Sequence, residues 1–251
     1  MALPHPVRIA HAFGNTRGRL QRALEANVDM IEVDIWYRRG DVYAHHARRL
    51  NPLPILADKK SSAHEFPWYA FPIWPRYRAW AQVRPLRLGE ILRTVAGKKH
   101  LLLDVKGRYK GNGSTDFAAA IARTIREHDA ASWSVVCGQT YSIFDALPGL
   151  AADIEVRYSL EKPWQWEAFL AKLREDGRMR QVCISRHFLD EEKKRLLDEN
   201  GVSRYVWTID DTDTARRFVD DGAHGIISND LALLAALPRV DGTGNNSEPR
   251  T

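Results

Sequence analysis

The chain has 251 residues, 44% of them hydrophobic, which is enough for one large domain. Its 37 Lys and Arg residues against 32 Asp and Glu residues give a formal charge of only +5, with no basic run, so we expect no nucleic-acid partner. No apolar run approaches the ~20 residues that span a bilayer, and the start of the chain lacks a signal-peptide pattern. A soluble cytoplasmic protein is expected, with Cys137 and Cys183 as reduced core residues.

Short β-rich runs alternate with helix-length amphipathic segments along most of the chain. The predicted strands are residues 7–10, 30–36 (extended by 42–44), 101–106, 134–137, 155–159, 181–184, 204–208 and 225–228. The predicted helices are residues 16–27, 88–95, 117–128, 143–147, 164–175, 190–200, 211–220 and 230–237. Ser114 or Thr115 is predicted to cap the third helix, and Pro148 to follow the fourth.

Eight strands alternating with helices predict an α/β fold, a single (β/α)8 TIM barrel. The alternative is an open doubly wound sheet, which would usually carry a glycine-rich phosphate loop after its first strand. Residues 11–16, HAFGNT, contain one glycine, which favours the barrel. We predict a barrel domain over residues 1–238 and a disordered tail over residues 239–251, because the tail is polar and rich in Gly and Asn.

Residues 51–86 interrupt the alternation and are expected to form an irregular, aromatic-rich insertion after the second strand. Seven aromatic residues fall between Phe66 and Trp80, and three prolines there disfavour a helix or a central strand. Two roles stay open for this loop. It is either a self-packed satellite core, or a loop near the site in which Trp74 and Arg76 contact substrate, an acyl chain or, transiently, a membrane surface.

Polar side chains gather at the C-terminal ends of the predicted strands, where barrels of this class place their chemistry. They are His11, Glu32, Asp34, His46, Asp104, Lys106, Trp207, Thr208 and Asp210. Residues two apart on a strand face the same side, which pairs Glu32 with Asp34 and Asp104 with Lys106. One acid at a strand end is adequately explained as a helix cap or an ion-pair partner. Six such groups on the first three strands indicate a site.

The residue types suggest metal-assisted acid–base chemistry on a phosphate. Glu32, Asp34 and Asp104 are hard oxygen ligands suited to one Mg²⁺ or Ca²⁺ ion. Lys106 can stabilise charge that develops on phosphate oxygens.

Two histidines complete the predicted site, because an imidazole titrates near neutral pH. His11 and His46 can act as the base and the acid. By alternation His45 faces away from His46, so we expect it to have a supporting role, structural or on the substrate side.

The sequence resembles the glycerophosphodiester phosphodiesterase family, within the phospholipase-C-like phosphodiesterase barrels. The block NTRGRLQRALEANVDMIEVDI, residues 15–35, matches the family's Asn-Thr to Glu-x-Asp register without a gap. HARRL matches His-Asp-x-x-Leu at His46 and Leu50. Three further segments resemble later family elements: RPLRLGEIL, LLLDVK and the block from Val206 to Asp230. The resemblance covers residues 7–237 and implies cleavage of a phosphodiester with the help of Mg²⁺ or Ca²⁺.

Several positions depart from the family pattern. The family's Arg-Gly after the first histidine is Ala12-Phe13, the aspartate after the second histidine is Ala47, and the third acid is Asp104 where the family has Glu. Asp-x-Lys with a short first loop is similar to the sphingomyelinase-D-like branch of the superfamily. In that superfamily the substrate's own hydroxyl can attack phosphorus and give a cyclic phosphate.

The predicted substrate is therefore a small glycerophosphodiester or a lysophospholipid, bound by Trp207, His45, Trp74 and Arg76. Two alternatives stay open. The first is a non-catalytic barrel that binds an anionic phosphate ligand, which the lost Arg and Asp would favour. The second is a metal-independent phosphodiesterase, which the three acids disfavour.

Overall fold

The computed structural model describes residues 3–50, 53–59, 66–82, 84–175 and 180–239. Apart from Arg239, the predicted tail lies outside the described residues. Among the described residues, no helix has both the length and the apolar character needed to cross a membrane.

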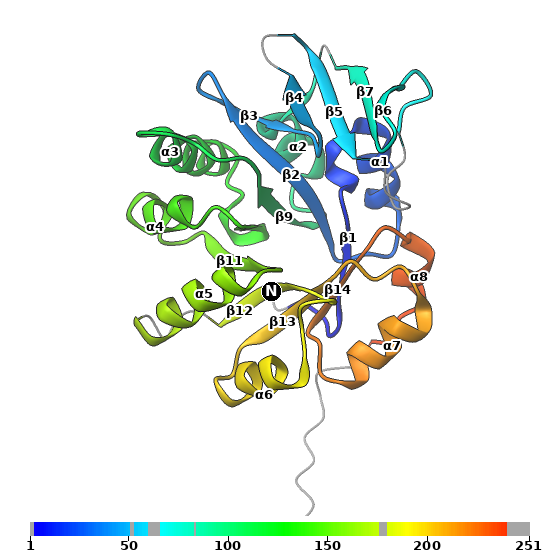
Figure 1. The fold of residues 1–251 in the computed structure, drawn as a ribbon, viewed down its shortest axis with the longest axis vertical. Helices are drawn as coiled ribbons and strands as arrows, with labels where there is room; N and C mark the ends of the chain where they lie inside the picture. The colour runs from blue at the N-terminus through cyan, green and yellow to red at the C-terminus, as the bar shows by residue number, and fades with distance from the viewer. Residues whose placement is uncertain (1–2, 51–52, 60–65, 83, 176–179, 240–251) are drawn as a thin grey trace, which may run out of the picture. The chain divides into compact units, whose positions relative to one another are not determined.

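The fold is α/β and has the strand order of a (β/α)8 TIM barrel (Figure 1), as predicted. The eight strands follow the order β1-β14-β13-β12-β11-β10-β9-β2, and β1 also pairs with β2. Their bounds are β1 Val7–Ala10, β2 Met30–Arg38, β9 His100–Val105, β10 Ser134–Gly138, β11 Glu155–Leu160, β12 Gln181–Ser185, β13 Ser203–Trp207 and β14 Gly225–Ser228. These bounds agree with the predicted strands to within two residues.

The helices lie where the amphipathic segments predicted them. They are α1 Arg17–Glu25, α2 Leu88–Val95, α3 Gly113–Arg126, α4 Tyr141–Leu150, α5 Pro163–Glu175, α6 Glu191–Glu199, α7 Thr212–Asp220 and α8 Leu231–Ala236. Three of them begin directly after an aspartate whose carboxylate accepts backbone N–H bonds of the first turn. Asp190, Asp211 and Asp230 are these N-caps, and each marks a predicted helix start.

Two predictions about helix ends are wrong. Helix α3 begins at Gly113 and its N-cap is Asn112, so neither Ser114 nor Thr115 is the cap. Helix α4 continues past Pro148 to Leu150, and the Ala151 N–H still donates to the Leu147 carbonyl at 2.8 Å. Pro148 lacks the N–H that would bond to the Phe144 carbonyl, and the helix ends two residues later, at Leu150.

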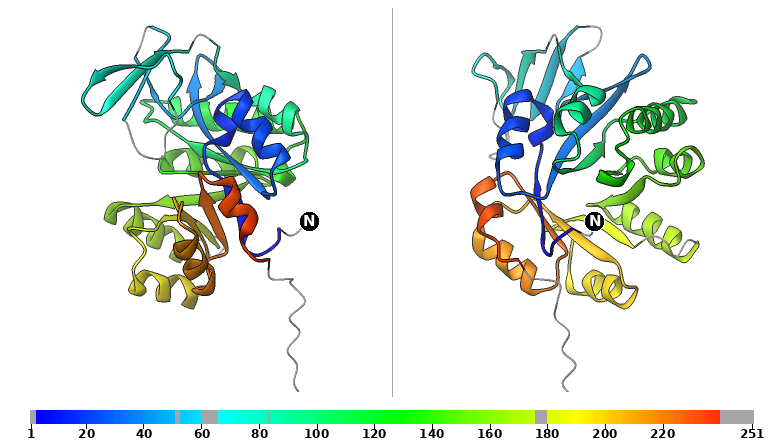
Figure 2. Two further views of the ribbon diagram at one scale, coloured as in Figure 1. Left: turned by 90° about the vertical axis from the view of Figure 1, so that its right-hand side faces the viewer. Right: turned by 180° about the vertical axis from the view of Figure 1, so that it is seen from behind.

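The prediction of an irregular segment over residues 51–86 is also wrong. Part of it forms a small antiparallel sheet with the order β4-β5-β7-β6. The strands are β4 Arg48–Leu50, β5 Ile55–Lys59, β6 Phe71–Trp74 and β7 Tyr77–Ala81. Pro72 lies in β6, an edge strand, where a missing N–H donor breaks no central ladder. Figure 2 shows this sheet in light blue to cyan, beyond the end of the darker blue β2.

The connection after β2 is a hairpin. Arg39 and Gly40 both have positive φ, 50° and 85°, and they turn the chain into β3 Asp41–Ala44, which runs antiparallel to β2. Strand β8, Leu86–Arg87, then pairs with β3, so that Tyr43 lies opposite Trp36 on one side and Arg87 on the other.

The chain divides into two compact units. Unit A comprises residues 11–25 and 31–156, and unit B comprises residues 1–10, 26–30 and 157–251. The core of unit A includes the fully buried Ile31, Leu103, Val136 and Phe117. In unit B, β1, β14, β13 and β12 pair in parallel, with Ile9 opposite Ile227.

Candidate active site

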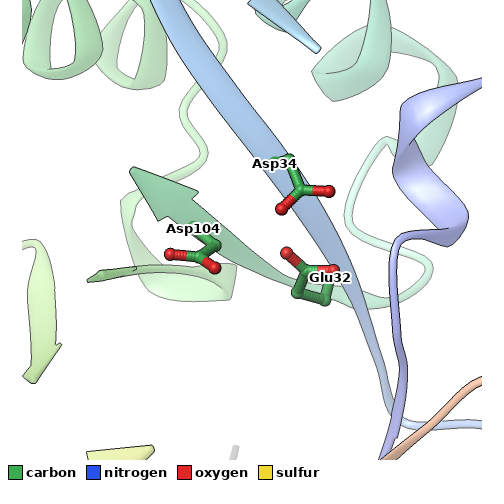
Figure 3. Close-up of side chains that lie close together, drawn as sticks. All are labelled: Glu32, Asp34 and Asp104. Atoms are coloured by element: carbon green, nitrogen blue, oxygen red, sulfur yellow. The ribbon is translucent and has the colours of Figure 1, made fainter. Parts of the chain in front are cut away.

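Two strands of unit A bring three carboxylates together (Figure 3). Glu32 and Asp34 alternate along β2 with Val33 and Ile35, so both acids leave the same face of the strand. Asp104 comes from β9, the neighbour of β2 in the sheet. One ligand atom from each acid lies within 4.8 Å of the others, and Glu32 and Asp34 are buried. The structure thus brings together the three predicted metal ligands, and their binding of a metal stays a prediction.

The acidic cluster, Glu32, Asp34 and Asp104, is electrostatically strained. Burial and the charges of Asp34 and Asp104 raise the pKa of Glu32 well above its usual value. Burial is also the main cause that raises the pKa of Asp104. A cation would offset both the lost hydration and the mutual repulsion.

Lys106 supplies one positive charge to this cluster. Its Nζ lies 2.9 Å from Asp34 Oδ1 and donates a hydrogen bond to Asp104. Burial by itself would lower the pKa of Lys106, but the three carboxylates outweigh burial and raise it well above its usual value. Lys106 is therefore charged, as its predicted role requires.

The donor set fits one Mg²⁺ or Ca²⁺ ion. Carboxylate oxygens are the ligands that both ions prefer. The buried Oε1 of Glu32 has no hydrogen-bond partner within the described part of the chain, so the cluster keeps an acceptor that a ligand can satisfy. Three carboxylates against one ammonium group also leave negative charge for a divalent cation to balance.

The segment before α1 holds two of the acids in place. The Ala12 N–H donates to Glu32 Oε2 at 2.5 Å. Asn15 Nδ2 donates to Asp34 Oδ2 at 2.5 Å, and Asn15 Oδ1 accepts the Asp34 N–H at 2.9 Å. Asn15 fixes both the side chain and the backbone of Asp34, a role that we did not assign from the sequence.

The close packing of this segment requires a glycine. A Cβ on Gly14 would lie 2.1 Å from Val33 Cγ2, nearer than any side chain tolerates. A glycine followed by a short amide side chain, Gly14-Asn15, is the sequence signal that could have identified the contact, because Asn both donates and accepts.

The structure pairs His46 with a residue that the sequence analysis missed. His46 Nδ1 forms a hydrogen bond and an ion pair with Asp58, which lies in β5 of the small sheet. Burial would lower the pKa of His46, but the bond to Asp58 and the charge of Asp34 outweigh burial and raise it. Asp58 had no signal in the sequence, because we interpreted its surroundings as irregular.

His11 follows β1 and is half-buried. Burial of Asp34 opposes its ionisation, yet the charges of Lys106, His46 and His11 together hold the pKa of Asp34 well below its usual value. Both predicted acid–base histidines therefore lie within electrostatic range of the acidic cluster.

His45 is packed tightly beside the cluster. Its ring stacks on Trp36, with centroids 5.3 Å apart and planes 11° from parallel. Its Nδ1 lies 2.7 Å from the Ala47 carbonyl, and its backbone carbonyl accepts the Trp36 Nε1–H. Burial lowers the pKa of His45, which keeps the imidazole neutral. These contacts fit the supporting role that we predicted.

The other predicted substrate-binding residues belong to other elements of the fold. Trp207 ends β13 in unit B and is half-buried. Trp74, on edge strand β6, is 72% exposed, and Arg76 is exposed in the following turn. Neither Trp74 nor Arg76 is enclosed by the described part of unit A.

The fold and site define a (β/α)8 barrel with acids on its second and third barrel strands, a lysine directly after the third, and histidines after the first strand and after the hairpin that follows the second. No family model matches the sequence, and no curated protein matches it. The evidence of similarity therefore comes from solved structures.

Solved structures that resemble this chain include phosphodiesterases. A Silicibacter pomeroyi protein assigned as a glycerophosphoryl diester phosphodiesterase matches with a TM-score of 0.72 and 16% identity over 92% of each chain. An Oleispira antarctica phosphodiesterase in complex with the product sn-glycerol-3-phosphate has a TM-score of 0.65 at 16% identity, covering 90% of this chain and 93% of that one. The Thermotoga maritima glycerophosphodiester phosphodiesterase has a TM-score of 0.64 at 16% identity, and the match covers 91% of this chain and 96% of that one. At this identity the matches establish the fold.

Proposed function

We propose that this chain is a divalent-cation-dependent phosphodiester hydrolase of the glycerophosphodiester phosphodiesterase type. The observation that carries the proposal is the cluster of three carboxylates from β2 and β9, with Lys106 among them. The Oleispira neighbour, whose bound product is sn-glycerol-3-phosphate, supports a small phosphate-bearing substrate. The proposed substrates are glycerophosphodiesters or lysophospholipids.

Glu32, Asp34 and Asp104 would hold one Mg²⁺ or Ca²⁺ ion. Such an ion supplies Lewis-acid polarisation of a phosphoryl oxygen when bound. Lys106, released from its aspartates, would donate to a phosphate oxygen and stabilise the charge that develops there. Asn15 and the Ala12 N–H hold the carboxylates for this purpose.

His11 and His46 are the proposed acid–base pair. The bond to Asp58 through Nδ1 orients the His46 ring, and Nε2 is the atom proposed to exchange a proton with the substrate. One histidine would take a proton from the attacking hydroxyl or water, and the other would give a proton to the leaving oxygen. Attack by the substrate's own hydroxyl gives a cyclic phosphate, the outcome suggested by the similarity to the sphingomyelinase-D-like branch.

The exposed aromatic residues of the small sheet support a lipid-related substrate. Trp68 is 94% exposed and Trp74 is 72% exposed, and Phe71 and Ile73 are also exposed on β6. Indole rings favour the boundary between water and acyl chains, and Arg76 adds positive charge. We propose that this sheet contacts a lysolipid acyl chain or a membrane surface. Trp207 remains a proposed substrate contact.

The protein is proposed to act in the cytoplasm. Its two cysteines are buried and form no disulfide, which fits a reducing compartment.

Phosphorus-31 NMR of the full chain with a panel of glycerophosphodiesters and lysolipids tests the function. We expect turnover with Mg²⁺ or Ca²⁺, and none in excess EDTA. Full activity in EDTA would contradict an essential metal. Binding without turnover of any substrate would favour a non-catalytic barrel. This is the principal alternative, because Ala12 and Ala47 stand where the family has Arg and Asp. The same spectra distinguish cyclic from open phosphate.

A further inference from the structure

A cavity lies in unit A, on the face of β2 that carries the acidic cluster. Side chains of Glu32, Asp34, Trp36 and Arg38 leave the same face because they alternate along the strand. The Cα of Arg38 is roughly 13 Å along the strand from that of Asp34, at ~3.3 Å per residue. The cavity begins at Trp36 and has a volume of about 500 Å³, within the range of small-molecule sites.

Three strands of the hairpin region build its floor. Tyr43 on β3 lies opposite Trp36 on β2, and Arg87 on β8 lies opposite Tyr43, so all three side chains share one face. The Arg87 guanidinium lies 5.9 Å from the centre of the Tyr43 ring. Trp36 also stacks on the ring of His45, which lines the same cavity.

The lining of this cavity is strongly cationic. Five arginines line it, against a single carboxylate among the described lining residues, that of Glu90. The arginines are Arg38, Arg49, Arg84, Arg87 and Arg93. The Glu90 carboxylate is already engaged, because it accepts from Arg17 at 2.9 Å and from the Arg87 N–H at 2.9 Å.

Among the described residues, Asp41 and Glu90 are the acids that contact these arginines, so most of the positive charge of the cavity is uncompensated. Asp41 lies 3.6 Å from Arg87, and both side chains are exposed. Arg93 approaches the His128 ring at 3.3 Å, which brings no negative charge.

Arg49 shows most directly that an anion would be accommodated. Its Nε is buried and, within the described residues, has no hydrogen-bond partner. Burial and the charges of Arg38 and Arg39 lower its pKa. A guanidinium group that is partly buried among like charges gains both a hydrogen bond and charge balance from an anion.

We propose that this arginine cavity, which nothing in the proposed reaction uses, is a binding site for a phosphomonoester dianion. A planar guanidinium group can bind two phosphate oxygens at once. Several arginines together also suit a ligand with two negative charges, such as a phosphomonoester, better than a ligand with a single carboxylate charge. The phosphate has two conceivable sources. It is either a second phosphate on the alcohol of the diester substrate, or a separate phosphate-bearing small molecule.

Calorimetric titration with inorganic phosphate, in excess EDTA and low salt, tests the site without turnover. In EDTA the acidic cluster stays negative and repels phosphate, so binding reports the arginine cavity. We expect one saturable site, weakened at least ~10-fold by Arg38→Gln and by Arg49→Gln, as for loss of a charged hydrogen bond. Arg195→Gln is the matched control, since Arg195 lies on α6 and pairs with Glu199.

Two further measurements keep the test decisive if a variant misfolds. Arg93 is exposed on α2, so Arg93→Gln is expected to fold and to weaken phosphate binding. In the unmodified chain, phosphate should protect Arg38 and Arg49 from phenylglyoxal, as mapped by mass spectrometry. Absence of saturable binding, or equal loss in Arg195→Gln, would overturn the site.

Kinetics with metal then identify the source. If Arg38→Gln raises KM at least ~10-fold for a diester whose alcohol carries a second phosphate, and not for the unphosphorylated diester, the substrate supplies the phosphate. If Arg38→Gln loses phosphate binding in the titration but leaves KM unchanged for both diesters, the phosphate belongs to a separate molecule. This last experiment alone rests on the proposed function, and a chain without turnover would still give the calorimetric result.

Discussion

The acidic cluster and the small sheet β4–β7 belong to the same unit and are built in opposite ways. In the cluster, buried carboxylates are fixed by β2, β9, Asn15 and Lys106. In the small sheet, all four residues of β6 are exposed. The cluster is organised by bonds inside the protein, whereas the aromatic surface is exposed, and its proposed contacts would come from a lysolipid or a membrane surface. Asp58 links the two regions, because it lies in the small sheet and bonds to His46.

The largest effect is expected at the cluster itself. Glu32→Gln keeps the size of the side chain but removes the charge of a proposed metal ligand. A metal ion contributes several kcal/mol to phosphoryl transfer, so we expect a loss of at least ~10³-fold in kcat. Calorimetric titration with Mg²⁺ and Ca²⁺ should show the matching loss of affinity, while circular dichroism stays unchanged. Unaltered turnover would mean that the cluster is structural.

The next effect concerns the two adjacent histidines. His46→Ala should cost ~10²-fold or more in kcat, the usual contribution of a positioned acid or base. His45→Ala should mainly lower the melting temperature, because it removes the Trp36 stack. Rate measurements on both variants at matched folded fractions separate these roles. A deeper rate loss in His45→Ala would reverse the assignment.

Asp58 tests whether the small sheet serves the chemistry. Asp58→Asn should slow turnover roughly tenfold, as for loss of a side chain that orients a functional histidine. The bond to Asp58 raises the pKa of His46, so its removal should move the limb of the pH–rate profile that belongs to His46 toward lower pH. The direction is the same whether His46 acts as acid or base. An unchanged profile with a lower melting temperature would make Asp58 purely structural.

The smallest effect is expected at the aromatic surface. Trp74→Ala should weaken use of a lysolipid severalfold and leave a short water-soluble diester unaffected, since ~0.8 kcal/mol per buried CH₂ is at stake only with an acyl chain. Trp80→Ala is the control, because Trp80 packs on Phe66 at 5.6 Å and is half-buried. It should lower stability and affect both substrates alike. Equal losses in Trp74→Ala would identify a structural role there too.

The barrel strands could be predicted well from the sequence, because a short β-rich run followed by an amphipathic helical segment repeats eight times. Glu32 and Asp34 could be placed on one face because strand alternation is fixed by the backbone. The small sheet escaped prediction because its strands are three to five residues long and Pro72 obscures β6. Asp58 and Asn15 were missed for a related reason, since their contacts join segments that no local pattern connects.

The ammonium group of Lys106 bridges two of the three acids, and this has a consequence for how the protein would acquire the proposed metal. The cluster already contains a counter-ion of its own, so the metal-free chain can fold without bringing three unneutralised carboxylates together. If Asp34 and Asp104 hold the proposed divalent ion, they would exchange their ion pairs with Lys106 for it, and the ammonium group would become available to a phosphate oxygen. Lys106 would thus stay in ion pairs with the aspartates in the metal-free protein. Binding of the ion would both complete the proposed metal site and release Lys106 to contact the phosphate.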